Sequence, residues 1–98
     1  MALKLYAKDV LIGMLTPLQG DGIDWPRVYY RFESTAEYSR FRNALDMKGR
    51  RRASRSQMTA CESMELRTVD DDGRETRWRF VFVDEKEQRA TLRAGFMV

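Results

Sequence analysis

The sequence contains no histidine, one cysteine and no long hydrophobic run. Histidine is the commonest general base and a frequent metal ligand, so its absence excludes Ser–His–Asp and Cys–His catalytic arrangements. The single cysteine, Cys61, excludes an internal disulfide, and one cysteine without histidine cannot form the usual structural zinc site. No GxGxxG or GxxxxGK motif is present, which excludes the common phosphate-binding loops. We therefore predict a binding protein rather than an enzyme, with no catalytic residues, no metal and no cofactor.

The same absences bear on location. The longest apolar stretch, Val10 to Leu15, has six residues, whereas a membrane-spanning helix needs about 20. The first residues carry charge too early and too often for a signal peptide, and small secreted domains usually contain several disulfides. We predict a cytoplasmic protein that has no membrane partner.

The chain does contain enough apolar residues for one core. It has 98 residues, of which 43% are hydrophobic, and this length is common for a single domain. Alternating apolar and polar residues predict a hairpin of strands 3–7 and 10–16 with a turn at 8–9, followed by a third strand at 27–33. The buried face of this third strand is predicted to carry Val28, Tyr30 and Phe32.

A helical pattern follows the third strand. Ser34 and Glu37 match the capping-box pattern, which predicts a helix start. We predict an exposed loop at 50–56, and residues 57–64 fit either a short second helix or an irregular connector. The first helix is predicted to extend to Lys48, with one apolar stripe formed by Tyr38, Phe41, Ala44 and Leu45.

The last third of the chain predicts three more strands, at residues 65–70, 75–83 and 89–98. Asp72-Gly73 is a strong hairpin signal, and it favours a hairpin tip over a metal site for the acidic residues 70–72, which cannot all reach one ion. The fold class that follows is α+β: an antiparallel sheet in the order βββ–α–βββ, packed against one main helix, with a short second helix as an option. Residues 1–98 form a single domain in this prediction.

Three aromatic residues recur at alternate positions in the strand at 75–83. Alternation places Trp78, Phe80 and Phe82 on one face, and Val81 and Val83 on the opposite face. The aromatics fit either the core beneath the helix or an exposed platform on which bases of single-stranded nucleic acid stack. We predict the core, because the helix stripe needs an apolar face to cover.

Positive charge is concentrated in residues 40–55. This segment has seven basic residues and one acidic residue, a net charge of +6, whereas the whole chain carries +3. Such a segment attracts phosphates or an acidic protein surface, and a solvated charge run is the other interpretation. Arg51-Arg52-Ala53-Ser54 also matches the substrate pattern of basophilic kinases, which we attribute to chance. The predicted binding residues are Arg40, Arg42, Lys48, Arg50, Arg51, Arg52 and Arg55.

A second set of arginines is predicted on the outer face of the C-terminal sheet, if its three strands pair in sequence order. Cross-strand charge pairs explain such a surface, and so does a secondary anion-binding patch. The arginines concerned are Arg67, Arg77, Arg79, Arg89 and Arg93.

The first 45 residues or so resemble a group of short uncharacterised bacterial proteins. The resemblance rests on Ile12-Gly13, Leu15-Thr16-Pro17, Phe32-Glu33-Ser34-Thr35 and the turn at 71–75, while the Arg-rich middle departs from the group. It implies a shared fold and a bacterial or bacteriophage accessory protein. It brings no activity and no site residues.

These observations lead to one leading prediction and two others. The leading prediction is a non-enzymatic protein that binds a polyanion, nucleic acid in particular, through the Arg-rich segment. A protein–protein module, such as an inhibitor or immunity-type factor, would use the same charge to bind an acidic partner. Self-association as a homodimer through an exposed strand edge is the third.

Overall fold

Eight strands form one sheet in the computed structural model, which describes residues 2–18, 23–24, 27–48 and 52–94. The predicted N-terminal hairpin and third strand are confirmed, and a two-residue strand lies between them. The predicted end of the last strand, beyond residue 94, lies outside the described residues. The strands are β1 (Leu3–Ala7), β2 (Val10–Pro17), β3 (Ile23–Asp24), β4 (Arg27–Ser34), β5 (Leu66–Val69), β6 (Glu75–Arg77), β7 (Phe80–Asp84) and β8 (Arg89–Arg93).

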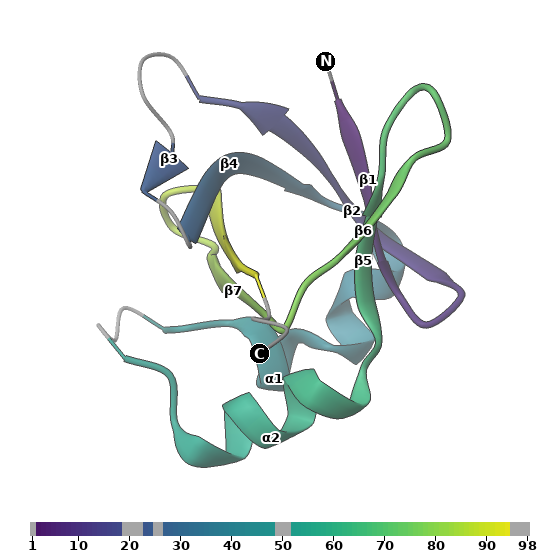
Figure 1. The fold of residues 1–98 in the computed structure, drawn as a ribbon. Helices are drawn as coiled ribbons and strands as arrows, with labels where there is room; N and C mark the ends of the chain where they lie inside the picture. Colours follow the sequence, from purple (N-terminus) through teal and green to yellow (C-terminus); the bar gives the residue numbers. More distant parts are fainter. Residues whose placement is uncertain (1, 19–22, 25–26, 49–51, 95–98) are drawn as a thin grey trace.

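Between β4 and β5 the chain is helical (Figure 1). A 3-10 helix, η1 (Ala36–Arg40), leads into one α-helical turn, α1 (Arg42–Leu45), and α2 (Arg55–Ser63) follows. The helical stretch predicted before Lys48 is found, but it is short and irregular, and the optional second helix is the main one. No helix in the described ranges is long and apolar enough to cross a membrane.

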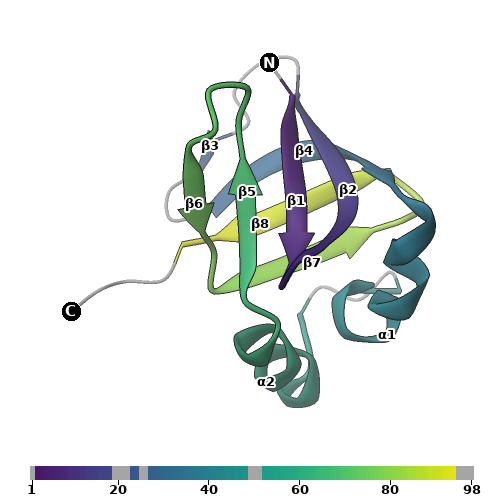
Figure 2. The ribbon, with the colours of Figure 1, turned by 90° about the vertical axis from the view of Figure 1, so that its right-hand side faces the viewer.

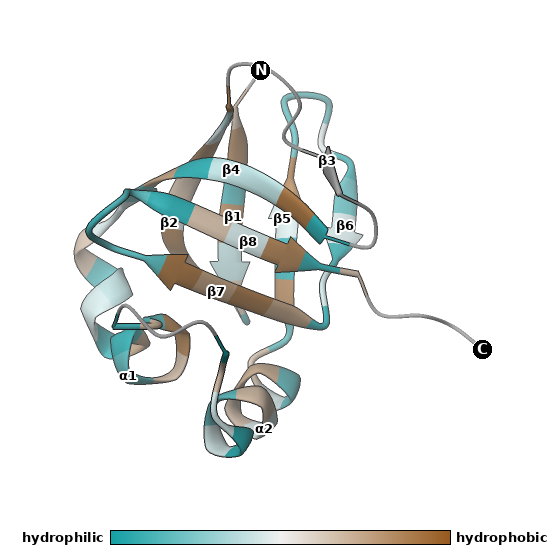
Figure 3. Ribbon diagram, turned by 90° about the vertical axis from the view of Figure 1, so that its left-hand side faces the viewer, coloured by the Kyte–Doolittle hydropathy of each residue, from teal (hydrophilic) through white to brown (hydrophobic). Residues whose placement is uncertain are grey.

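The strand order is β6–β5–β1–β2–β4–β8–β7, with β3 beside β4, and all strand pairs are antiparallel. The sheet curls into a half-barrel, in which β6, β5, β1 and β2 form one wall and β4, β8 and β7 lie behind it (Figure 2). The helices lie together at one end of the curl, beside β7 (Figure 3). The predicted α+β class is confirmed.

Both walls and the helical segment contribute buried side chains, and removal of this apolar surface from water is the main source of stability. The predicted helix stripe is confirmed, because Tyr38 and Leu45 are buried and Phe41 and Ala44 pack against the core. Tyr38 meets the ring of Phe32 edge-on, at a centroid distance of 5.1 Å. The fully buried strand residues are Leu5, Ala7, Ile12, Leu15, Val81, Val83, Ala90 and Leu92.

The predicted strand at 75–83 is two strands, because the chain changes its pairing partner between Trp78 and Arg79. The amide of Trp78 donates to the carbonyl of Leu66 in β5, whereas the amide of Arg79 donates to the carbonyl of Arg93 in β8, both at 3.0 Å. β5 and β8 lie near opposite ends of the strand order. The segment from β6 to β7 therefore joins the two walls.

This change of partner exchanges the predicted faces of β7. A shift of one residue in the alternation moves every later side chain to the other face. Val81 and Val83 are fully buried, so the prediction that they lie outside is wrong. Phe80 and Phe82 instead share the outer face, although Phe80 is still buried and Phe82 partly buried. Trp78, before the break, donates from its indole to a buried threonine of β5 at 3.0 Å.

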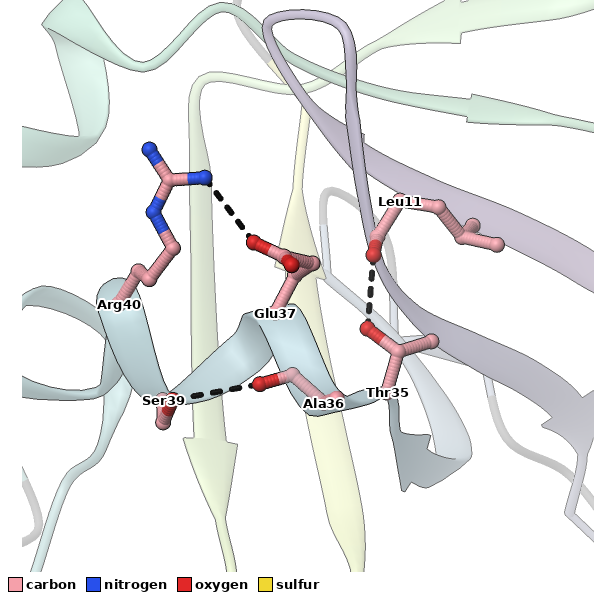
Figure 4. A network of polar contacts seen from close by, with 6 residues as sticks. All are labelled: Leu11, Thr35, Ala36, Glu37, Ser39 and Arg40. Atoms are coloured by element: carbon pink, nitrogen blue, oxygen red, sulfur yellow. Dashed lines mark hydrogen bonds and ion pairs between the residues drawn. The ribbon is translucent and has the colours of Figure 1, made fainter.

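The predicted capping box at Ser34 and Glu37 is wrong. The residue at the start of η1 is Thr35, whose hydroxyl donates to the carbonyl of Leu11 at 2.7 Å and so joins this segment to β2 (Figure 4). Glu37 instead forms an ion pair with Arg40 at 2.9 Å. Attachment to the sheet, rather than a side-chain cap, therefore sets the start of this helical segment.

A capping box does occur at the start of α2. The Ser54 hydroxyl accepts from the Gln57 amide at 3.2 Å, and the Gln57 side chain accepts from the Ser54 amide at 3.1 Å. Gln57 also donates to the carbonyl of Asp46 at 2.7 Å. The predicted loop at 50–56 is therefore wrong for its last residues, because Arg55 and Ser56 belong to α2.

Cys61 offers a test of the packing of α2. Burial raises the pKa of its thiol, and the thiol is 1% exposed, with its sulfur 3.6 Å from the carbonyl oxygen of Val81. A native-state opening of a few kcal/mol must precede any reaction of such a group. We expect Cys61 to react with an aromatic disulfide reagent at least about 100-fold more slowly in buffer than in 8 M urea. Equal rates would contradict the packing of α2 on β7.

Candidate functional site

The register of β4, β8 and β7 arranges the outer face of one wall in three rows. Residues directly opposite on antiparallel strands share a face. Val81, Val83, Ala90 and Leu92 occupy the inner face, so their sequence neighbours point outward. We call the outer surface the arginine face; its rows are Arg27–Arg93–Phe80, Tyr29–Thr91–Phe82 and Arg31–Arg89–Asp84.

The arginine face forms the floor of a groove of about 840 Å³, within the usual range of about 300–1,000 Å³ for ligand sites. One wall comes from the helical segment, with Met47, Arg52 and Ala53 between α1 and α2, and Met58 from α2. Figure 3 looks onto β4, β8 and β7, with both helices beside β7. The floor residues of the groove are Arg27, Tyr29, Phe80, Phe82, Asp84, Arg89, Thr91 and Arg93.

The groove concentrates positive charge that its own residues do not neutralise. Four arginines and one carboxylate, that of Asp84, line it. Arg27 lies directly opposite Arg93, and Arg31 directly opposite Arg89, and like charges in such positions destabilise a sheet. Within the described ranges, none of these opposed arginines takes part in an ion pair. Asp84 lies directly opposite Arg89 on its other side, whereas the row of Arg27 and Arg93 holds no carboxylate, so this pair costs stability unless an anion lies between the two arginines.

Aromatic rings lie beside these arginines. Phe80 and Phe82 are nearly parallel, with centroids 5.8 Å apart and planes at 16°. The guanidinium carbon of Arg89 lies 5.8 Å from the ring centroid of Tyr29, and that of Arg79 lies 4.9 Å from the ring centroid of Phe80. Cation–π contacts at these distances are favourable. The groove therefore combines cations with flat apolar surface.

Models of known protein families, curated proteins and solved structures contain no match to this chain. The resemblance of the first 45 residues or so to short bacterial proteins therefore stays a prediction. The role of the groove has to be inferred from its own residues.

The basic residues of the Arg-rich segment, 40–55, do not share one surface in the structure. Arg40 pairs with Glu37 at 2.9 Å, and Arg42 pairs with Glu85 at 3.1 Å, so both face carboxylates of this chain. Of the predicted binding residues that the structure describes, Arg52 is the one that lines the groove. The others are Lys48 and Arg55, which are exposed outside the groove lining, and Arg50 and Arg51, which lie outside the described residues.

The arginines of the predicted secondary patch lie on two different walls of the sheet, because the C-terminal strands do not pair in sequence order. Arg67 and Arg77 lie opposite each other on β5 and β6, in the wall away from Arg93. Arg67 is paired there with Glu75 at 3.0 Å, and Arg79 is paired with a glutamate of α2 at 3.2 Å. Of this set, Arg93 and its neighbour on β8, Arg89, line the groove.

Sequence reasoning missed Arg27 and Tyr29 as site residues, and it gave Phe80 and Phe82 as a stacking platform only as the alternative to a core role. Alternation in residues 27–33 placed the first two opposite the buried face, but nothing in the sequence connected β4 with β8. Phe80 is buried and Phe82 packs against the core, as a core role requires, but the break after Trp78 places both rings on the outer face. Alternation of apolar and polar residues therefore placed Arg27 and Tyr29 on the correct face, whereas it placed Phe80 and Phe82 on the wrong one.

The carboxyl groups of Asp46 and Glu85 lie close together near the groove but do not line it. Burial raises the pKa of Glu85, a hydrogen bond to Asp46 and the charge of Asp46 raise it further, and Arg42 opposes this effect. Burial also raises the pKa of Tyr38, whose hydroxyl is buried without a hydrogen-bond partner among the described residues. Asp46 accepts the amide of Lys48 at 3.1 Å. These contacts attach the end of α1 to the turn after β7.

The acidic residues at 70–72 form the predicted hairpin tip. A carboxylate oxygen of Asp70 accepts the amides of Asp72 and Arg74, each at 2.9 Å. Across the described ranges, no three histidine, cysteine, aspartate or glutamate side chains converge as a metal-binding group. The groove is therefore the site whose chemistry we pursue.

Proposed function

We propose that this protein binds nucleic acid in the groove and does not catalyse a reaction. The observation that carries the proposal is the direct opposition of Arg27 and Arg93 on neighbouring strands. A phosphate between them would accept hydrogen bonds from both guanidinium groups, and charge-assisted bonds of this kind are stronger than neutral ones. The repulsion between the two arginines would then be relieved on binding.

A second arginine of β8 that lines the groove, Arg89, supports a polymeric ligand. Arg89 precedes Arg93 by four residues on β8, which places the two backbone positions about 13 Å apart. A single phosphate does not extend over that distance, whereas successive phosphates of a chain do. Arg52 adds a further cation from the helical wall.

An acidic protein surface is the competing partner, because carboxylates also accept from arginine. The aromatic floor favours nucleic acid, since Tyr29 and Phe82 are partly exposed rings in the groove, and such rings suit bases. This is why we place the protein–protein module second.

The salt dependence of binding tests the proposal. Each phosphate neutralised on a single strand contributes about −0.7 to the slope of log K against log salt. With three or four phosphates bound, we expect a slope of about −2 to −3, and a roughly 15- to 65-fold loss of affinity between 50 and 200 mM salt. Fluorescence anisotropy with labelled DNA and RNA oligonucleotides measures both values.

Absence of binding to DNA and RNA at 20 mM salt would overturn the proposal. Binding that does not weaken with salt would do the same, because it would leave the arginines without a role. A chain that ignores nucleic acid but forms a one-to-one complex with an acidic protein of its host would instead support the protein–protein module.

A further inference from the structure

Both elements that enclose the groove contribute an apolar side chain to it. Phe82 lies in the floor, partly buried, and Met58 lies in the wall. Within the described residues, Met58 is the one large hydrophobic side chain that is exposed, at 37%. Sugar–phosphate contacts alone make no use of such surface, because they need only cations and hydrogen-bond donors.

The position of Phe82 relates this apolar surface to the arginines. Its row, Tyr29–Thr91–Phe82, lies between the two rows that carry the opposed arginines. Rows are two residues apart along a strand, a separation of about 6.6 Å. A group attached between two bound phosphates would therefore reach the middle row.

The place of Phe82 on β7 favours this ring over Tyr29, because β7 is the strand that packs beside α2, the helix that carries Met58. The ring of Phe82 lies nearly parallel to that of Phe80, with centroids 5.8 Å apart, so a base would stack on its other face. Thr91, directly opposite Phe82, is small, and its hydroxyl can both donate to and accept from the edge of a base. Met58 has an unbranched, adaptable side chain that suits a flat ligand of variable outline.

We infer that the groove selects single-stranded nucleic acid, because an unpaired base stacks on Phe82 while the arginines hold phosphates of the strand on either side of it. The inference rests on the proposed function. In a duplex the faces of the bases are covered by their neighbours, so a duplex could offer the groove only phosphates. A polyanion without bases could likewise offer the groove only its phosphates.

Replacing Phe82 by leucine separates stacking from charge. We expect F82L to lose roughly 5- to 150-fold in affinity for a single-stranded oligonucleotide, the range that one lost base–aromatic stack produces. Its affinity for inorganic polyphosphate is expected to stay within about twofold of the original, because the arginines are unchanged. Phe41→Leu is the matched control, since Phe41 lies in the helical segment outside the groove lining.

Photocrosslinking of the unaltered chain gives a second readout that does not depend on the folding of a variant. An oligonucleotide carrying 5-iodouracil is expected to crosslink to the peptide that contains Phe82, and a duplex of the same sequence is not. Crosslinks confined to other peptides would overturn the inference.

The possible failures are distinguishable. If F82L binds single strands as the original chain does, or if duplex and single strand bind equally, stacking on Phe82 is wrong while binding of nucleic acid in the groove stands. If the original chain binds polyphosphate, duplex and single strand not at all, the proposed function itself is wrong.

Discussion

Replacing Arg27 and Arg93 together by glutamine is expected to weaken nucleic-acid binding by roughly 150-fold or more. A hydrogen bond to a charged group contributes about 1.5–3 kcal/mol, so the loss of two contacts corresponds to at least about 3 kcal/mol. The slope of log K against log salt should become less steep by about 0.7, because the one phosphate that the two arginines hold is no longer neutralised. Fluorescence anisotropy over a salt series measures both effects.

The same double variant should not lose stability. Arg27 and Arg93 repel one another across β4 and β8, so neutralising them is expected to raise the free energy of unfolding by about 0.2–1 kcal/mol. Urea unfolding followed by circular dichroism measures this change. Weaker binding together with higher stability is typical of a binding site whose charges were kept at the expense of the fold.

Arg40→Gln/Arg77→Gln is the matched control, with the same change in net charge. Arg40 is in an exposed ion pair with Glu37, and Arg77 lies on β6, in the other wall. Neither residue lines the groove. We expect less than about a threefold change in affinity, since only the long-range field is reduced. An equal loss in both double variants would show that net charge, rather than the groove, governs binding.

Replacing Val83 by aspartate is expected to abolish cooperative folding. Val83 is fully buried in the core wall and its carbonyl accepts the amide of Met47 at 2.9 Å. An unpaired buried charge costs about 3–5 kcal/mol or more, a large part of the roughly 5–15 kcal/mol that stabilises a domain. Thermal unfolding by circular dichroism should show no sharp transition for V83D.

Phe82→Asp is the comparison that makes this result specific. Phe82 is the residue before Val83, and its side chain lies in the groove among arginines. A carboxylate there is hydrated and faces opposite charge, so F82D is expected to unfold cooperatively. Simple alternation from Glu75 predicts the reverse order of stability for the two variants. A folded V83D with an unfolded F82D would contradict the break at Trp78 and Arg79.

Local patterns predicted much of the fold because they depend on neighbours in the sequence. Alternation predicted β1, β2 and β4, and the spacing of Tyr38 and Leu45 predicted the buried stripe of the helical segment. The capping box predicted at Ser34 and Glu37 does not form, and the Thr35 hydroxyl instead joins that segment to β2 by donating to the carbonyl of Leu11. Leu11 is distant from Thr35 in the sequence, so local spacing could not predict this bond.

The candidate site was much less predictable. The density of arginines in residues 40–55 directed attention to that segment, yet Arg40 and Arg42 face carboxylates of the chain itself. Composition measures how many charges a segment has, and it says nothing about which acids the fold brings beside them. Arg52 is the described member of this segment that reaches the groove.

The sequence by itself determined an α+β domain with an excess of arginine and without histidine, because class and composition follow from local periodicity and residue counts. Only the tertiary structure decided which arginines meet. Arg27 and Arg93 are distant in the sequence and become neighbours through the pairing of β4 with β8. Phe82 joins them because the chain changes partner after Trp78, which turns its ring outward. Periodicity describes the two faces of a strand, whereas the packing of the whole sheet decides which strands are adjacent and which face is outside.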